Sequence, residues 1–163
     1  MIFKFKKHNT DLYNILLSLS RNFFFYKGIN LPDNFETRIY LMFMHFSIFM
    51  IISKKKGKKF SQESYDNLFH CIENNLRELG FGDVSVNKKM KELNKIFYDI
   101  LLKLSDNPTK FNLNKKLIHK YFVKFIDNDK KWCKFDDYFL NFYQFCFDQS
   151  NNNMIKEVQN FKY

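Results

Sequence analysis

The sequence predicts an all-α protein that folds as a single compact domain of about six helices. Apolar residues recur every three or four positions through successive segments, which is the spacing of a buried helix face. The 163 residues include only four glycines and two prolines, and no segment shows several alternating strands in series. These observations exclude turn-rich sandwiches and glycine-rich nucleotide-binding folds.

Capping signals define the first two helices. One helix is expected over 11–22. Asp33 and Glu36, which follow Pro32, form a capping-box pattern that predicts a long second helix ending near Ser53.

The second helix contains the longest apolar run, residues 39–52 (IYLMFMHFSIFMII). As a helix this run extends about 21 Å, which is short of the hydrocarbon core of about 30 Å. We therefore expect a buried helix of a soluble domain rather than a membrane span.

The remaining helices follow from similar signals. Ser61 is the expected cap of a helix over 62–79, and Gly80 stands where a C-terminal glycine ends a helix. A fourth helix over 86–104 stops before Pro108. Asn112 is the expected cap of a fifth helix over 113–126, and a sixth is expected over 135–147. The helical domain is thus predicted over 11–149, between a basic segment (1–10) and an Asn-rich tail (150–163) that frays beyond one short helix.

The third helix has two distinct faces. Its apolar face consists of Tyr65, Leu68, Phe69, Ile72, Leu76 and Leu79. Its polar stripe consists of Asp66, His70, Glu73 and Arg77, which form two acid-before-base pairs at i,i+4, each worth about 0.2–0.5 kcal/mol. Ordinary surface pairs are the commoner outcome of this pattern. Arginine favours a more specific role, because its planar fork can donate two parallel hydrogen bonds, which an ammonium cannot do.

The positive charge is unevenly distributed. The chain carries 27 Lys and Arg against 17 Asp and Glu, a net charge of +10, yet only three of these cations are arginines. The abundance of Lys and Asn, with no alanine, is typical of an AT-rich coding sequence. The densest patch, hereafter the lysine patch, consists of Lys54, Lys55, Lys56, Lys58 and Lys59. It is predicted to face anionic lipid headgroups or ribosomal RNA, with an ordinary solvated turn as the alternative.

No catalytic or metal-binding pattern is found. Residues 80–85 (GFGDVS) lack the order of a phosphate loop and are expected to connect two helices, with Asp83 or Ser85 as the cap; an anion at that helix start is the minority alternative. A calcium loop over 127–138 is excluded because Lys131 and Tyr138 occupy ligand positions. The histidines and cysteines lack zinc-ligand spacing. We expect no enzyme activity, no cofactor and no small-molecule substrate.

The three cysteines are odd in number and have no paired spacing, and no secretory segment precedes the first helix. A reducing, cytosolic-type compartment is therefore expected.

Two blocks of the sequence resemble the ubiquinol–cytochrome c chaperone family, the assembly factors of respiratory complex III. The first block consists of Leu31-Pro32-Asp33, Arg38, Leu41 and His45. The second consists of Gln62, Asp66, Phe69 and the segment LRELGFGDVSVNKKMK (76–91). With the first helix, the resemblance spans about 12–104 and includes all three arginines. The chain departs from the family pattern at Asn34 (usually Thr), at Thr37 (usually Gly), and at Asp99-Ile100, where relatives tend to have Gly-Arg.

The resemblance implies an assembly chaperone that binds newly made cytochrome b and supports biogenesis of the ubiquinol–cytochrome c reductase complex. It implies a location at the inner face of the cytoplasmic membrane, or in the mitochondrial matrix of a eukaryote. A small partner protein and the ribosome are further implied partners, and the lysine patch adds an anionic membrane surface as a candidate. Candidate residues for contact with the client or a partner are Arg38, His45, Asp66, Glu73, Arg77, Glu78, Asp83 and Lys88. The alternative function is a basic helical RNA- or ribosome-binding protein acting in translation.

His45 has two interpretations. It is either an internal histidine hydrogen-bonded to a neighbouring helix, with the Asp66 stripe as one candidate partner, or a contact to the client or to haem. The internal interpretation is favoured, because buried polar groups are usually satisfied within the protein.

Overall fold

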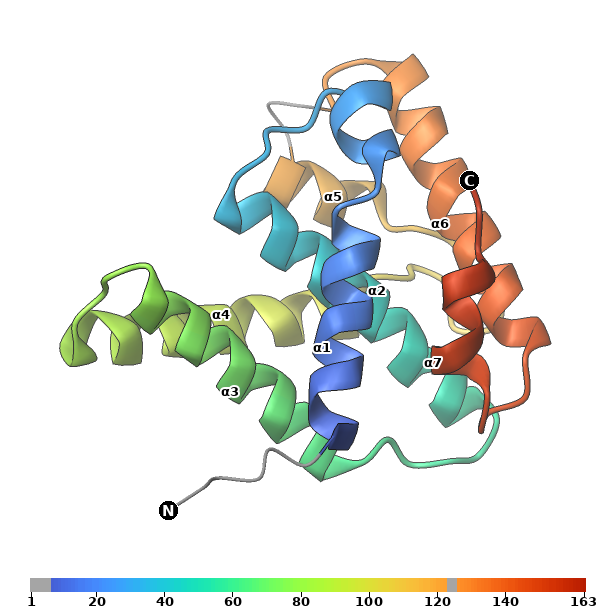
Figure 1. Cartoon of the computed structure of the whole chain (residues 1–163). Coiled ribbons are helices and arrows are strands. Elements are labelled where there is room, and N and C mark those ends of the chain that lie inside the picture. Colours follow the sequence, from blue (N-terminus) through green and yellow to red (C-terminus); the bar gives the residue numbers. More distant parts are fainter. Residues whose placement is uncertain (1–6, 123–125) are drawn as a thin grey trace.

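A computed structural model describes residues 7–122 and 126–163, and the side chains from residue 11 onward. Helices account for most of the described part of the chain, which contains no strand and one isolated bridge between Ser105 and Leu113. The all-α prediction is confirmed (Figure 1). The elements are α1 (Lys7–Ser20), a π-helix (Phe24–Gly28), α2 (Phe35–Lys55), α3 (Gln62–Glu78), α4 (Asp83–Lys103), α5 (Lys115–Phe122), α6 (Asp129–Asp148), α7 (Met154–Glu157) and a 3₁₀ turn (Val158–Asn160).

Helix α2 is the centre of the fold and packs against α1, α4 and α6. It is long and apolar enough to cross a membrane by length and composition, but 67% of its most apolar window is buried by the rest of the protein. Phenylalanines fill the space around it: the Phe43 ring lies 5.3 Å from that of Phe97 on α4. Each fully buried Phe contributes about 1.5–3 kcal/mol relative to an exposed one. The expected buried helix is confirmed.

Several helices begin at a different residue from the one expected. The cap of α2 is Asn34, whose Oδ1 accepts a hydrogen bond from the Thr37 amide at 2.9 Å. The expected cap, Asp33, instead forms an ion pair with Arg38. Helix α4 begins after Gly82 without a side-chain cap, so the expected cap at Asp83 or Ser85 was wrong, and the helix is three residues longer at this end.

The later helices also start and end differently from the prediction. Asn114 rather than Asn112 caps α5, because its Oδ1 accepts from the amides of Lys116 and Leu117. Helix α6 starts six residues early because the Asn128 side chain accepts from the Lys131 amide at 2.9 Å. The predicted fifth helix over 113–126 includes residues 123–125, which lie outside the described residues. Short polar side chains abound in these loops, so the sequence offered several competing caps.

Glycine ends two helices, and one of these glycines, Gly80, was expected to do so. Gly80 follows α3 with a φ of +95°, its amide donates to Arg77 O, and the Phe81 amide donates to Leu76 O. Gly57 follows α2 with a φ of +73° and is held by the corresponding pair of bonds. This left-handed conformation satisfies the last carbonyls of each helix and costs glycine little.

The Asn-rich tail does not fray, contrary to the expectation. Met154 and Val158 are buried, and the ring of Phe161 lies 5.2 Å from that of Phe142 on α6. The Tyr163 hydroxyl donates to Asp137 Oδ2 at 2.8 Å. The tail therefore belongs to the core, because apolar residues between the asparagines reach α6.

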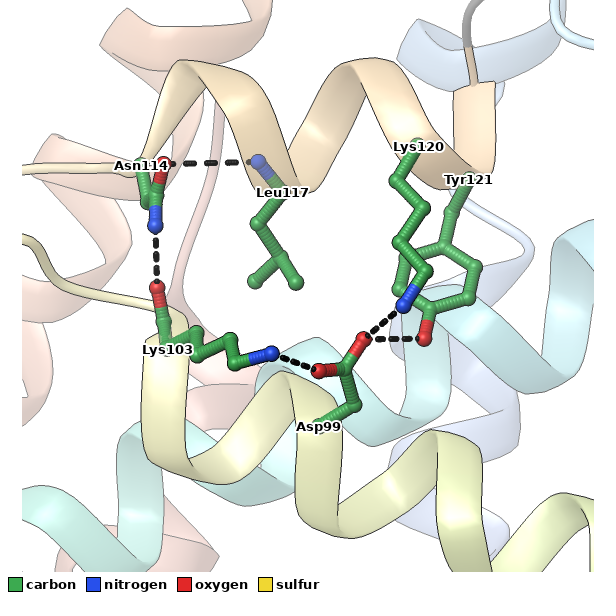
Figure 2. Close-up of polar contacts among 6 residues, drawn as sticks. All are labelled: Asp99, Lys103, Asn114, Leu117, Lys120 and Tyr121. Atoms are coloured by element: carbon green, nitrogen blue, oxygen red, sulfur yellow. Dashed lines mark hydrogen bonds and ion pairs between the residues drawn. The ribbon is translucent and has the colours of Figure 1, made fainter.

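Asp99 joins α4 to α5 (Figure 2). Its carboxylate accepts from Lys103 Nζ at 2.6 Å, from Lys120 Nζ at 2.7 Å and from the Tyr121 hydroxyl at 2.5 Å. Hydrogen bonds from Lys103, Lys120 and Tyr121, in that order, hold the pKa of Asp99 well below its usual range. This departure from the family pattern thus has a structural role.

The substitution Asp99→Asn is expected to lower the free energy of unfolding at pH 7 by about 1–2 kcal/mol, because three donors lose their anionic acceptor. A carboxylate with a depressed pKa stabilises the fold above the pKa of the unfolded chain, near 4, and loses that contribution as the pH falls. The difference in unfolding free energy between the wild type and Asp99→Asn should therefore be smaller at pH 3 than at pH 7, as measured by urea unfolding. Asp106→Asn is the matched control, since Asp106 accepts from the neutral amide of Asn112. Equal stability of wild type and Asp99→Asn at pH 7 would contradict this role.

Candidate functional site

The turn between α3 and α4 is the candidate functional site. The two helices form a hairpin that projects from the bundle, and its turn lies far from α6 and α7 (Figure 1). Residues Leu79-Gly80-Phe81-Gly82 make this turn, and Asp83 and Val84 are the first residues of α4. A Cβ added at Gly80 or Gly82 would meet nothing within 4 Å, so the backbone here is open to an incoming partner.

Three apolar side chains are exposed at this turn. Leu79 is 57% exposed, Phe81 46% and Val84 84%, and we call these three residues the apolar tip. Leu79 was expected on the buried face of α3, and that expectation was wrong: the helix ends at Glu78, so Leu79 lies beyond the last turn. Leu76, three residues earlier, is buried. Clustered exposed apolar residues mark interaction sites.

An ion-pair network supports the base of the apolar tip. Arg77 donates from one terminal nitrogen to Glu73 Oε1 at 3.1 Å and from the other to the Asp83 carboxylate. The hydrogen bonds to Asp83 and then Glu73 raise the pKa of the Arg77 guanidinium. Because the planar fork reaches both helices at once, Arg77 fixes the angle of the turn, which a lysine cannot do equally well. The predicted Glu73–Arg77 pair is confirmed.

The second predicted pair of the stripe does not form. Asp66 accepts a hydrogen bond from Gln62 Nε2 at 2.9 Å, whereas His70 Nδ1 lies 3.8 Å from Glu73. Glu78 and Lys88 are exposed near the apolar tip. The predicted residues therefore form two groups. Five of them lie at or beside the turn: Glu73, Arg77, Glu78, Asp83 and Lys88. Asp66 lies about 16 Å before Arg77 along the axis of α3.

His45 is an internal histidine. Its side chain is fully buried, Nδ1 lies 2.6 Å from Leu41 O, and Nε2 lies 2.9 Å from the Tyr138 hydroxyl. A carbonyl oxygen can only accept, so Nδ1 carries the proton and Nε2 accepts from Tyr138. The internal interpretation is confirmed, although the partner helix is α6 rather than the Asp66 stripe. As a contact residue for a client, His45 offers no exposed atom.

The lysine patch is partly used inside the protein. Lys56 Nζ donates to the carbonyls of Phe147 at 2.6 Å and Gln149 at 2.5 Å, and Lys58 Nζ donates to Asn152 at 3.3 Å. An ammonium group at the C-terminus of α6 satisfies free carbonyls and the negative end of the helix dipole. Lys56 and Lys58 thus have partners inside the protein, while Lys54, Lys55 and Lys59 are exposed, with Lys55 lying 5.4 Å from the Tyr143 ring. The contact of the patch with lipid headgroups or ribosomal RNA stays a prediction.

Arg38 lines a small pocket between α1, α2 and α3, whose lining includes no residue of the apolar tip. A groove of about 880 Å³ runs between α1 and the C-terminal segment, and its lining includes none of the predicted residues. The described residues contain no group of three or more His, Cys, Asp or Glu that could hold a metal ion.

Sequence reasoning missed the apolar tip itself. The available signal was the pair Gly80 and Gly82 on either side of Phe81, because glycines at a helix end predict a turn, and residues in such connections lie on the surface. An apolar residue placed there is a candidate contact rather than a core residue.

Comparison with known proteins gives one match. The family described as Ubiquinol-cytochrome C chaperone matches residues 27–128, which is more than half of the chain and includes α2, α3, α4 and the whole turn. The match begins after the predicted N-terminal resemblance and extends past its expected end at residue 104. Neither a curated protein nor a solved structure matches the chain.

Proposed function

Because this chain belongs to the ubiquinol–cytochrome C chaperone family, we propose that it binds newly made cytochrome b and supports biogenesis of the ubiquinol–cytochrome c reductase complex. A chaperone of this family has a client protein as its partner. The single observation that carries the proposal is the apolar tip, which lies within the family match and is held out from the bundle.

The chemistry of the apolar tip suits a client that spans membranes. Segments of a membrane protein that await insertion are continuous apolar surfaces, and burial of apolar area is the general driving force for covering them. Three exposed side chains can bury only a limited area. The resulting contact is weak enough to be released, as a protein that hands its client to an assembling complex requires.

The rigid base of the tip adds to this role. Arg77 binds both Glu73 on α3 and Asp83 on α4, and this link across the turn limits the conformational entropy that is lost when the client binds. The charged groups around the tip, including Glu78 and Lys88, form the polar rim expected around an apolar contact. We place this activity at the inner face of the cytoplasmic membrane, or in the mitochondrial matrix if the host is a eukaryote.

Deletion of the gene tests the proposal. We expect the deletion strain to lose most of its reduced cytochrome b absorbance and its quinol–cytochrome c reductase activity, both restored by the wild-type gene. Absorbance of the terminal oxidase haems is the internal control, because a general defect in haem supply would lower it as well. Normal cytochrome b absorbance and reductase activity in the deletion strain would refute the proposal.

A further inference from the structure

We propose that the pocket between α1, α2 and α3 binds a small oxyanion group, a carboxylate or a phosphate, through Arg21 and Arg38. This pocket, hereafter the arginine pocket, has a volume of about 230 Å³. Its polar lining is Arg21, Arg38, Tyr13 and Asn75, and its apolar lining includes Phe35 and Met42.

The two guanidinium groups are incompletely paired. Arg38 Nε lies 3.0 Å from Asp33 Oδ1, but the approach is not aligned as a hydrogen bond, and this buried nitrogen has no hydrogen-bond partner. Within the part of the chain that the structure describes, Arg21 forms no ion pair. Two guanidinium groups therefore line the pocket, with the carboxylate of Asp33 beside Arg38 and that of Glu78 within electrostatic range of Tyr13.

The neutral groups of the pocket are also donors. The Tyr13 hydroxyl and the Asn75 amide are joined only loosely, at 3.5 Å. Burial of the side chain is the main cause that raises the pKa of Tyr13, so its hydroxyl stays protonated and can donate. A phenol, an amide and two guanidinium groups around one hollow form a set of donors that matches an anionic oxygen group.

The choice of arginine supports a specific ligand. The chain has 24 lysines and three arginines, and two of those three line this one pocket. Lysine or arginine would equally well attract an anion by charge alone, whereas only the guanidinium fork matches the two oxygens of a carboxylate or phosphate.

The size of the pocket limits the ligand. A volume of about 230 Å³ corresponds to several water molecules at about 30 Å³ each, and it is smaller than the roughly 300–1,000 Å³ of pockets for drug-sized ligands. The ligand group is therefore a single carboxylate or phosphate on a short stem, and the apolar wall of Phe35 and Met42 suits that stem. This inference does not depend on the identity of the client.

The three arginines allow a direct test, since each gives one Nε–Hε signal in a ¹⁵N-resolved NMR spectrum. We would titrate the full-length protein with inorganic phosphate and, separately, with glutarate, replacing chloride so that ionic strength stays constant. The signals of Arg21 and Arg38 are expected to shift together and to saturate, while that of Arg77 stays in place. Arg21→Lys and Arg38→Lys should each weaken binding at least tenfold, and Arg77→Lys, the matched control, should not.

The outcomes separate the two ligand sources and the alternatives. If only phosphate saturates the signals, the ligand carries a phosphate group. If only glutarate does, the ligand carries a carboxylate. If both do, the site accepts either oxyanion. Linear shifts of all three arginine signals, or unchanged binding in both lysine variants, would overturn the proposal. The wild-type titration decides the matter even if Arg38→Lys fails to fold. A negative result here leaves the deletion phenotype unaffected, so the two proposals fail separately.

Discussion

Lowering the pH from 7 to 4.5 is expected to reduce the free energy of unfolding by about 2 kcal/mol through His45. Desolvation by burial, only partly opposed by the hydrogen bond to Leu41 O, lowers the pKa of His45 to about 4. In the unfolded chain the pKa is near 6.5. Between these values the unfolded state binds a proton that the folded state does not. The contribution of neutral His45 to stability is therefore fully present above about pH 6.5 and is lost as the pH falls towards 4.

Urea unfolding at pH 7, 5.5 and 4.5 measures this effect, and a double variant isolates it. His45→Leu or Tyr138→Phe alone leaves a buried polar group without its partner, at a cost of about 1–3 kcal/mol. The combination removes both ring and hydroxyl, and should be less destabilising than the two single effects added together. The double variant should also lose most of the pH dependence between 6.5 and 4. An unchanged pH dependence would show that His45 is not its source.

Replacing the apolar tip by Leu79→Ser, Phe81→Ser and Val84→Ser is expected to lower cytochrome b levels at least tenfold in a complemented deletion strain. A tenfold loss of client affinity corresponds to 1.4 kcal/mol, which is less than the burial of three apolar side chains can supply. The free energy of unfolding should change by no more than about 1.5 kcal/mol, because each of the three exposed substitutions contributes about 0.5 kcal/mol or less.

The control for this experiment is an exposed leucine on α4, the helix that also carries Val84. Leu102, on α4, is 76% exposed and lies outside the tip, so Leu102→Ser should support normal cytochrome b levels. Reduced cytochrome b absorbance is compared between the strains, and thermal unfolding is measured on each purified protein. If the triple variant fully restores absorbance, the apolar tip is not the client contact.

The sequence was sufficient for the fold class, because helical periodicity and helix-ending glycines are local signals. Gly80 ended α3 where expected, and the apolar run of α2 became the core helix. Caps were predicted less well. Both Asn34 and Asp33 can accept a hydrogen bond from a backbone amide. Asn34 is the cap because Asp33 forms an ion pair with Arg38 instead.

The site was harder to predict because exposure is a property of the whole fold. Leu79 matches the apolar period of α3, yet no helix covers the position that it reaches beyond Glu78. Lys56 resembles its neighbours in the lysine patch, and only the position of the C-terminus of α6 gives it a separate role. Contacts between residues about 90 positions apart leave no local pattern.

The bond between His45 and Tyr138 has a consequence for synthesis. The two residues are separated by 93 positions, and a ribosome adds about 5–20 residues per second. For roughly 5–20 seconds after α2 emerges, its most apolar surface therefore has no α6 to cover it. The family match ends at residue 128, just before that covering helix begins. During its own translation this protein therefore has an apolar helix that nothing yet covers. We propose that it protects its client in the same condition.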